Sequence, residues 1–211
     1  MPSPKFQRRK NDRPAEITEA ALAVFAENGY SATRVDDVAK RAGVSKGLLY
    51  LYFKTKEELF KAVIRSFVAP KVRELSSIVD ESDLSAEEFI RGPFLTMIKT
   101  LPESPIRIMV RLMFSEGHKH PDLVEFYWEN VVVHAIEMMK KLIARGVAEG
   151  QFRNTAVDEL PQLFVSPVIF SIFWNQVFEK HAKLDTDLLI ETHIDSMLNY
   201  LKIQAGTGAG E

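Results

Sequence analysis

The sequence predicts an all-α protein of about nine helices, three in an N-terminal head, one that connects, and five behind. Apolar residues recur at intervals of three and four along most of the chain, as on the buried face of a helix. No stretch shows the sustained alternation of apolar and polar residues that is typical of a half-buried strand. Residues that favour helix ends, such as Ser85 before one apolar pattern and Gly150 after another, mark where the helices begin and end.

The composition is ordinary for a soluble globular protein of one or two domains. Of the 211 residues, 46% are hydrophobic and 27% are charged. No apolar run approaches the roughly 18 residues that a membrane-spanning helix needs, and residues 1–13 lack the apolar core of a signal peptide. The absence of cysteine excludes disulfides, thiol catalysis and cysteine-based zinc sites. It is compatible with the cytoplasm, where we expect the protein to act.

The N-terminal end combines a basic arm with the first helix. Residues 1–13 carry five basic side chains and almost nothing apolar, so we expect a disordered arm. It is either a solvated tail or an arm that lies along phosphates or in a minor groove. Pro14 opens a helix that ends near Asn28–Gly29. Its apolar stripe consists of Ile17, Ala20, Ala21, Val24 and Phe25.

Two short helices joined by a tight turn follow the first helix. Thr33 is a good N-cap for the first of them, and Asp36 supplies a weak form of the capping box. Gly43 ends this helix at a position where a residue without Cβ fits best. Ser45 then caps the next helix, which covers residues 46–52.

The second short helix carries an unusual surface. Its sequence KGLLYLY places apolar or aromatic groups on all sides, and Tyr50, Leu51 and Tyr52 cannot all point toward one core. Lys46 lies in its first turn, and two further lysines follow its end. Such a helix suits a groove lined with phosphates, as in the helix-turn-helix motif, whose second helix enters the DNA major groove.

The charge distribution agrees with this interpretation. The net charge is −2, but residues 1–65 contain 13 Lys and Arg against 8 Asp and Glu, which gives 13 − 8 = +5. The remaining residues contain 14 and 21, which gives 14 − 21 = −7. Because phosphate binding requires positive charge, the asymmetry assigns the DNA-binding role to the head.

Amphipathic helices account for the residues behind the head. We expect a DNA-binding domain over residues 14–68, a second helical domain over 69–205 and a flexible tail over 206–211. One helix is expected from Lys56, and Pro70 bends or ends it. The next begins at the capping box of Ser85, is disturbed by Gly92–Pro93 and is closed by Pro102. The others run from Ser104–Pro105 to Gly117, from Pro121 to Gly150, from the cap Asp158 through an interruption at Pro167 to near His181, and from Asp187 to Leu201.

The head has a specific family resemblance. The run from Ala20 to Leu59, which contains AVFAENGYSATRVDDVAKRAGVSKGLLYLYFKTKEEL, resembles the DNA-binding domain of the tetracycline-repressor (TetR) family of bacterial transcriptional regulators. Only the helical architecture of the remaining two thirds is family-like. The matching features are the helix end at Phe25–Gly29, Val38–Ala39, Gly43-Val44-Ser45, Leu49-Tyr50, Tyr52-Phe53 and Lys54–Lys56.

The resemblance and the charge of the head predict the residues that contact DNA. Lys46 is expected at guanine edges, Leu51 at a thymine methyl group, and the two tyrosines at phosphates. For Tyr52 the alternative is packing against the following helix. Gly47 is expected to allow close approach of the backbone. The full predicted set is Thr33, Arg34, Lys46, Gly47, Tyr50, Leu51, Tyr52, Lys54 and Lys56.

The resemblance also implies a homodimer, because one head contacts too little DNA for tight specific binding. Two copies would read the half-sites of a palindromic operator. The segments Leu163–Val177 and Leu188–Leu201 have more apolar surface than one face needs, which suits a four-helix bundle formed by two copies. The alternative is that these residues simply close the core of one subunit.

A small, largely apolar effector is expected to bind the second domain and release a repressor from its operator. Met and Phe residues of this domain suit an apolar pocket, although ordinary core packing is the better explanation of any single one of them. Arg111, Glu116, Asn175 and Gln176 are possible polar anchors. The candidate lining is Phe94, Met97, Met109, Met113, Phe114, Phe126, Trp128, Phe170 and Trp174.

Other functions are less well supported. His118 and His120 lie near Glu116 and Asp122, but their spacing is a weak metal signal and a solvated loop fits better. We expect no metal and no cofactor. No glycine-rich phosphate loop, serine elbow or HExxH motif indicates an enzyme. The alternative to a DNA-binding regulator is an all-helical ligand-binding or adaptor protein whose helix-turn-helix contacts another protein.

Overall fold

The computed structural model describes the backbone of residues 4–203 and the side chains of residues 13–203. Within this range the chain forms helices and no strand, apart from one isolated antiparallel bridge between Phe152 and Lys202. The prediction of an all-α fold is confirmed. The predicted flexible tail, residues 206–211, lies outside the described residues.

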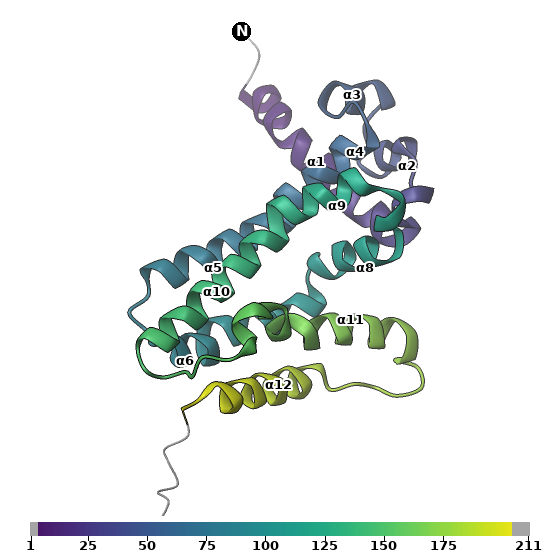
Figure 1. The fold of residues 1–211 in the computed structure, drawn as a ribbon. Coiled ribbons are helices and arrows are strands. Elements are labelled where there is room, and N and C mark those ends of the chain that lie inside the picture. Colours follow the sequence, from purple (N-terminus) through teal and green to yellow (C-terminus); the bar gives the residue numbers. More distant parts are fainter. Residues whose placement is uncertain (1–3, 204–211) are drawn as a thin grey trace, which may run out of the picture. The chain divides into compact units, whose positions relative to one another are not determined.

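The described chain contains nine continuous helices when adjoining helical segments are joined, as predicted. Short 3₁₀ turns lie at Leu101–Glu103, Gly117–Lys119, Ala156–Glu159 and Pro161–Val165. The helices are α1 (Pro4–Ala32), α2 (Val35–Arg41), α3 (Lys46–Tyr52), α4 with α5 (Lys56–Val63 and Ala69–Glu81), α6 with α7 (Ala86–Phe89 and Leu95–Thr100), α8 (Ile106–Glu116), α9 with α10 (Pro121–Tyr127 and Val133–Ala148), α11 (Ser166–Phe178) and α12 (Thr186–Leu201) (Figure 1).

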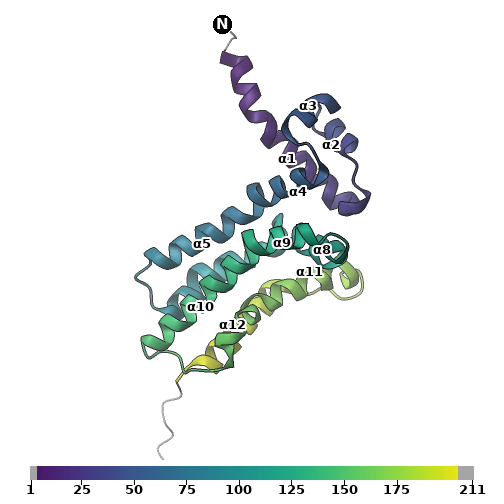
Figure 2. The same cartoon turned by 45° about the horizontal axis from the view of Figure 1, so that its top comes forward.

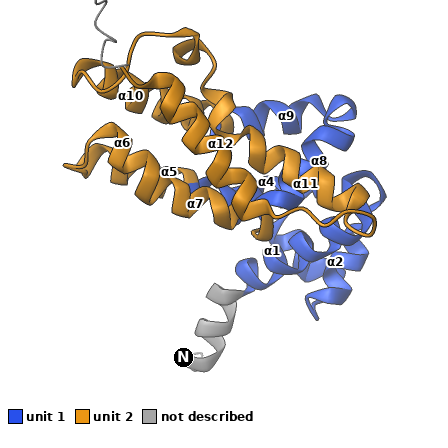
Figure 3. Ribbon diagram, turned by 90° about the horizontal axis from the view of Figure 1, so that it is seen from below, with its two compact units in different colours: residues 1–71, 105–131 blue, residues 72–104, 132–211 orange. Residues whose placement is uncertain are grey.

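The chain divides into two compact units (Figure 3). The first consists of residues 1–71 and 105–131, and the second of residues 72–104 and 132–211. The sequence predicted a boundary after residue 68 and assigned everything beyond it to the second domain. Residues 105–131 instead join the first unit, because α8 packs on α1, where Arg111 donates a hydrogen bond to the carbonyl of Ala26 at 2.5 Å.

The first unit is built around an aromatic cluster between α1 and α4. Phe25 and Phe60 are fully buried, and Tyr30 is 7% exposed. The ring centroids of Phe25 and Tyr30 each lie 5.2 Å from that of Phe60, in edge-to-face geometry. Helix α2 packs on α1, and α3 packs on α2 (Figure 2).

Helix α1 is longer than predicted. It begins at Pro4, so it includes most of the stretch that was expected to be a disordered arm. A proline suits a first helical turn, and the Lys, Gln and Arg residues that follow have good helix propensity. Pro14, the predicted start, therefore lies inside α1. The end is where the sequence placed it, because Gly29 has φ of +77° and interrupts the helix.

Three π-helical segments, Ile64–Val68, Ile90–Phe94 and Trp128–Val132, widen the longer helices. The first two accompany prolines that a regular helix tolerates poorly, since Pro70 and Pro93 have no N–H group to donate. The helix therefore continues through Pro70 and through Gly92–Pro93, where the sequence predicted a bend and a disturbance.

In the second unit, α12 packs against α7 and α11 (Figure 3). Phe94 and Phe164 are buried and meet edge to face, with ring centroids 6.1 Å apart. Ion pairs to α12 lie at the surface of this unit. Arg91 Nη1 lies 2.5 Å from Asp195 Oδ1, and Lys99 Nζ lies 2.6 Å from Glu191 Oε1. Exposed pairs of this kind contribute little stability, so the apolar contacts between these helices hold the unit together.

The start of α11 differs from the prediction. Asp158 does not cap this helix, because it lies in the 3₁₀ turn Ala156–Glu159, whose N-cap is Thr155. Pro167 does not interrupt α11 but lies in its first turn, where a missing N–H group removes no helical hydrogen bond. The helix ends at Phe178 and not near His181.

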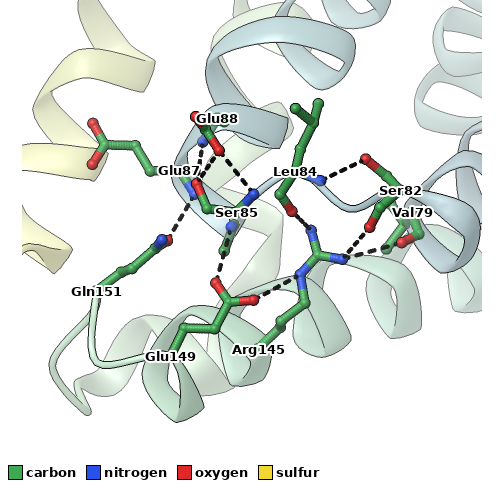
Figure 4. A network of polar contacts seen from close by, with 10 residues as sticks. Val79, Ser82, Leu84, Ser85, Glu87, Glu88, Arg145, Glu149 and Gln151 are labelled. Atoms are coloured by element: carbon green, nitrogen blue, oxygen red, sulfur yellow. Dashed lines mark hydrogen bonds and ion pairs between the residues drawn. The ribbon is translucent and has the colours of Figure 1, made fainter.

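The predicted capping box before α6 is confirmed (Figure 4). The Ser85 hydroxyl accepts a hydrogen bond from the Glu88 amide at 3.4 Å, and the Glu88 carboxylate accepts one from the Ser85 amide at 3.0 Å. Nearby, the Arg145 guanidinium donates to the carbonyls of Val79, Ser82 and Leu84. These bonds fix the loop between α5 and α6 without a strand or disulfide.

Candidate nucleic-acid interface

The turn between α2 and α3 has a defined backbone path. Gly43 adopts φ of +65°, and the Val44 amide donates to the Ala39 carbonyl at 3.0 Å. The Ser45 hydroxyl accepts a hydrogen bond from the Leu48 amide at 3.2 Å and so caps α3. The predicted roles of Gly43 and Ser45 are confirmed. Together they fix the point at which α3 begins.

Helix α3 is attached to the core through one buried side chain, Leu49. Leu51, two residues on, is 71% exposed, and Tyr50 and Tyr52 are half-buried. Gly47 is exposed, and a Cβ added there would meet no atom within 4 Å. The outer face of α3 is therefore open to a large partner.

Lys46, in the first turn of α3, forms an ion pair with Asp36 of α2. Its Nζ lies 2.7 Å from Asp36 Oδ1, and both side chains are more than half exposed. The hydrogen bond and the charge of Asp36 raise the pKa of Lys46, so the side chain is an ammonium at neutral pH. Because exposed ion pairs are weak, this lysine can exchange Asp36 for another acceptor.

Thr33 and Arg34, both predicted DNA contacts, differ in exposure. Thr33 is 3% exposed, and its hydroxyl donates to the Gly29 carbonyl at 2.6 Å. The prediction that Thr33 caps α2 is wrong, because the N-cap is Arg34 and has no side-chain cap bond. The Thr33 hydroxyl turns back to α1 because a carbonyl freed at the end of that helix lies within reach. Arg34 is exposed.

The two predicted phosphate-binding lysines also differ. Lys54 is exposed. Lys56 instead donates to three backbone carbonyls, those of Tyr30, Ser31 and Thr33, at 2.8, 3.0 and 3.1 Å. Its Nζ lies 4.6 Å from the centroid of the Tyr30 ring. Burial lowers the pKa of Lys56, although the charge of Glu116 opposes this effect. No pattern in the sequence indicates this internal role.

These features assemble a three-helix head with an exposed recognition helix, and comparison with known proteins agrees with it. Residues 17–63 match the family described as "Bacterial regulatory proteins, tetR family". The head is a TetR-family DNA-binding domain. TetR-family proteins are transcriptional regulators that bind DNA operators and small-molecule effectors, and they are not enzymes.

Curated relatives match over most of their length. The chain is 28% identical to the uncharacterized HTH-type transcriptional regulator YfiR of Bacillus subtilis, over 90% of this chain and 93% of that protein. It is also 28% identical to the HTH-type transcriptional repressor KstR2 of Mycobacterium tuberculosis, over 78% of this chain and 82% of the repressor.

Solved structures share the fold over most of the chain. FadR from Bacillus subtilis, solved in complex with stearoyl-CoA, superposes with a TM-score of 0.73 at 20% identity, covering 89% of this chain and 98% of FadR. A putative fatty acid metabolism regulator from Clostridium perfringens gives a TM-score of 0.71 at 23% identity, covering 90% and 100% of the two chains. The described helices thus form a TetR-family fold in both units.

The residues predicted to line an effector pocket fall into three classes of exposure. Phe94 and Met109 are buried; Met97, Met113, Phe126 and Trp174 are half-buried; Phe114, Trp128 and Phe170 are at least 50% exposed. Within the first unit, Phe126 lies beneath the cations of Lys61 and Arg65, at 5.3 and 4.8 Å from its ring centroid. A surface hollow of about 400 Å³ in the second unit involves none of these residues. Its lining consists of Ser85, Glu87, Glu88, Arg91, Gly150, Gln151, Lys202 and Ile203.

The possible polar anchors and metal ligands have other contacts. Arg111 bonds to α1, and Asn175 donates weakly to Thr186 at 3.4 Å. His120 is not a solvated loop residue, because its ring packs edge-on against Tyr30 with centroids 4.6 Å apart. No group of three or more potential metal ligands occurs among the residues that the structure describes. No helix in that part of the chain is long and apolar enough to cross a membrane.

Proposed function

We propose that this TetR-family regulator is a repressor that binds a palindromic operator as a homodimer, with α3 of each copy in a major groove. The observation that carries the proposal is the exposed outer face of α3. Leu51 is 71% exposed on a helix that needs only Leu49 for anchorage. An apolar side chain in this position suits contact with a thymine methyl group.

The proposed DNA contacts divide by chemistry. Lys46 in the first turn of α3 reads base edges, where a lysine prefers the O6 and N7 atoms of guanine. Tyr50, Tyr52 and Lys54 contact phosphates, and Gly47 allows the backbone to approach. Arg34 joins this set as an exposed cation at the start of α2. Thr33 and Lys56 do not contact DNA in this proposal. They stabilise the backbone behind the interface, because the Thr33 hydroxyl donates to the Gly29 carbonyl and the Lys56 ammonium donates to the Thr33 carbonyl.

We propose that α11 and α12 form the dimer interface. Both helices belong to the second unit (Figure 3). Each has large apolar side chains that are exposed to solvent. Isolated exposed apolar residues need no explanation, but a cluster on two adjacent helices favours a second copy of the same face. The exposed residues are Phe170, Val177 and Phe178 on α11 and Leu188 and Tyr200 on α12.

The proposed effector is a bulky apolar molecule. The Met- and Phe-rich helices support this class, and so do the names of two relatives. KstR2 is described as a ketosteroid transcriptional regulator, and a Bacillus subtilis protein that is 32% identical over 81 residues is named a fatty acid metabolism regulator. Stearoyl-CoA, the ligand of the FadR complex, is therefore the first candidate to test.

The DNA-binding proposal is tested by selecting duplexes from a random pool with the full chain. Lys46→Ala should weaken the selected site by about 1–3 kcal/mol and relax the preference at one base position. Lys40→Ala removes the same charge from an exposed position on α2 and serves as the control. Enrichment of no duplex would argue for a protein partner in place of DNA, whereas equal affinity and an unchanged preference in both variants would argue that Lys46 does not read a base.

The interface proposal is tested by light scattering of the full chain. Val177→Asp places a charge on the exposed apolar face of α11 and should convert the dimer to a monomer. Thr96→Asp adds the same charge at an exposed position of α7 and should leave the dimer intact. A Val177→Asp variant that remains dimeric would contradict the assignment.

The effector proposal is tested by titrating the protein–operator complex with stearoyl-CoA. Calorimetry without DNA first establishes whether the ligand binds. Binding should lower operator affinity, because a ligand can shift a conformational equilibrium only through its different affinities for the two states. Absence of binding would exclude stearoyl-CoA as the effector. Binding with unchanged operator affinity would refute release by the effector.

A further inference from the structure

The connection from the break in α1 at Gly29 to the start of α2, residues 29–34, includes the last residues of α1 and is held by a carboxylate from α8. Glu116 Oε1 accepts a hydrogen bond from the Tyr30 amide at 2.9 Å, and its Oε2 accepts one from the Ser31 amide at 2.8 Å. Both donors follow the break at Gly29. Partial burial opposes ionisation of Glu116, but hydrogen bonds from Ser31 and Tyr30 outweigh it and lower the pKa. The carboxylate is therefore charged at neutral pH and makes strong charge-assisted bonds.

Gly29 and Glu116 fit each other closely. A Cβ at residue 29 would lie 2.6 Å from Glu116 Oε1, and φ of +77° already disfavours any side chain there. The carboxylate can reach the two amides only because this position is a glycine. The α1 break thus both frees the amides and leaves the space for their acceptor.

Two further side chains hold the same connection. The Lys56 ammonium donates hydrogen bonds to three carbonyls of residues 30–33. The carboxylate therefore binds the amides of this connection and the ammonium binds its carbonyls. His120, just beyond α8, stacks edge-on against Tyr30 and places its Nε2 3.1 Å from the Ser31 hydroxyl. All these groups belong to the first unit.

We propose that Glu116 is a positioning residue for DNA binding, which rests on the function proposed above. Residues 29–34 lead directly into α2, whose N-cap is Arg34, and α3 follows after one turn. By fixing this connection, the carboxylate sets where α2 and α3 lie relative to α1. It changes operator affinity through the protein and without a contact to DNA. From the sequence, Glu116 is a possible effector anchor and a neighbour of the weak metal signal at His118 and His120, but not a positioning residue.

The first test measures amide hydrogen exchange in the full chain without DNA. Glu116→Gln keeps the shape of the side chain but removes its charge, and should speed exchange at Tyr30 and Ser31 by roughly tenfold. The matched control is Glu125→Gln, an exposed glutamate on α9 of the same unit. Unchanged protection of both amides in Glu116→Gln would overturn the proposal.

The second test measures affinity for a duplex selected by the wild-type chain and for an unrelated duplex. Glu116→Gln should bind the selected duplex about tenfold more weakly, with non-specific affinity and salt slope close to those of Glu125→Gln. Faster exchange with unchanged specific affinity would overturn the positioning role and leave the DNA-binding proposal intact. A wild-type chain that enriches no duplex would refute the proposed function, whatever the exchange result.

Discussion

Replacing Lys56 with methionine tests the internal role of this lysine. Methionine keeps most of the apolar stem and removes the ammonium, so the carbonyls of Tyr30, Ser31 and Thr33 lose their common donor. A hydrogen bond to a charged group contributes about 1.5–3 kcal/mol, and an exposed cation–π contact about 0.5–1 kcal/mol. One ammonium shared among several acceptors gains less than their sum, and its desolvation opposes the gain, so we expect a loss of about 2 kcal/mol.

Lys54→Met is the matched control, because it makes the same chemical change two residues away at an exposed position. Urea unfolding followed by circular dichroism should show a midpoint about 1 M lower for Lys56→Met, given a slope of roughly 2 kcal/mol per M. The Lys54→Met midpoint should match that of the wild type.

In DNA binding, Lys54→Met should have the larger effect of the two variants. Lys54→Met should reduce the slope of log affinity against log salt by about 0.9, the value for one phosphate contact. Lys56→Met should change this slope less, since its ammonium is bonded to backbone carbonyls. Equal urea midpoints for the two variants, or a salt slope altered only by Lys56→Met, would refute the reasoning.

Three further predictions concern stability. Gly146→Ala should lower the free energy of unfolding by about 1–3 kcal/mol, because the new Cβ would lie 2.2 Å from the buried Phe152 ring. In the same urea assay, Gly92→Ala should be neutral or stabilising, because no atom lies within 4 Å of its Cβ position. Ser85→Ala should cost about 1 kcal/mol in thermal or urea unfolding through loss of the capping box; an unchanged value would deny the cap any energetic role. Glu116→Gln should lower the free energy of unfolding by its full amount at pH 7. This loss should shrink as the pH falls below about 4.5, because the folded state lowers the pKa of the Glu116 carboxylate from 4.5. A loss that stays constant down to pH 3 would contradict this.

Local signals explain why the helix-turn-helix could be read from the sequence. Gly43 and Ser45 act within a few residues of their own positions, through a left-handed backbone and a side-chain cap. The same local rules failed at Thr33, because the freed carbonyl of Gly29 competed for its hydroxyl. Propensity alone cannot rank two such acceptors.

Contacts between distant residues were beyond sequence reasoning. Lys56 meets Tyr30 across 26 positions and Glu116 meets it across 86, so no spacing rule links them. The placement of residues 105–131 with the first unit depends on the same tertiary contacts. The signal that was available, a glycine ending α1 before a polar connection, indicated a helix end but not what would bind the amides there.

The attachment of α3 through Leu49 has an evolutionary consequence. Lys46, Gly47 and Leu51 can be replaced without opening the hydrophobic core, since all three are exposed. Descendants of such a gene can therefore acquire new target sites by point mutation while their folding stays intact. A duplicated copy would need few compensating changes elsewhere to serve a different promoter.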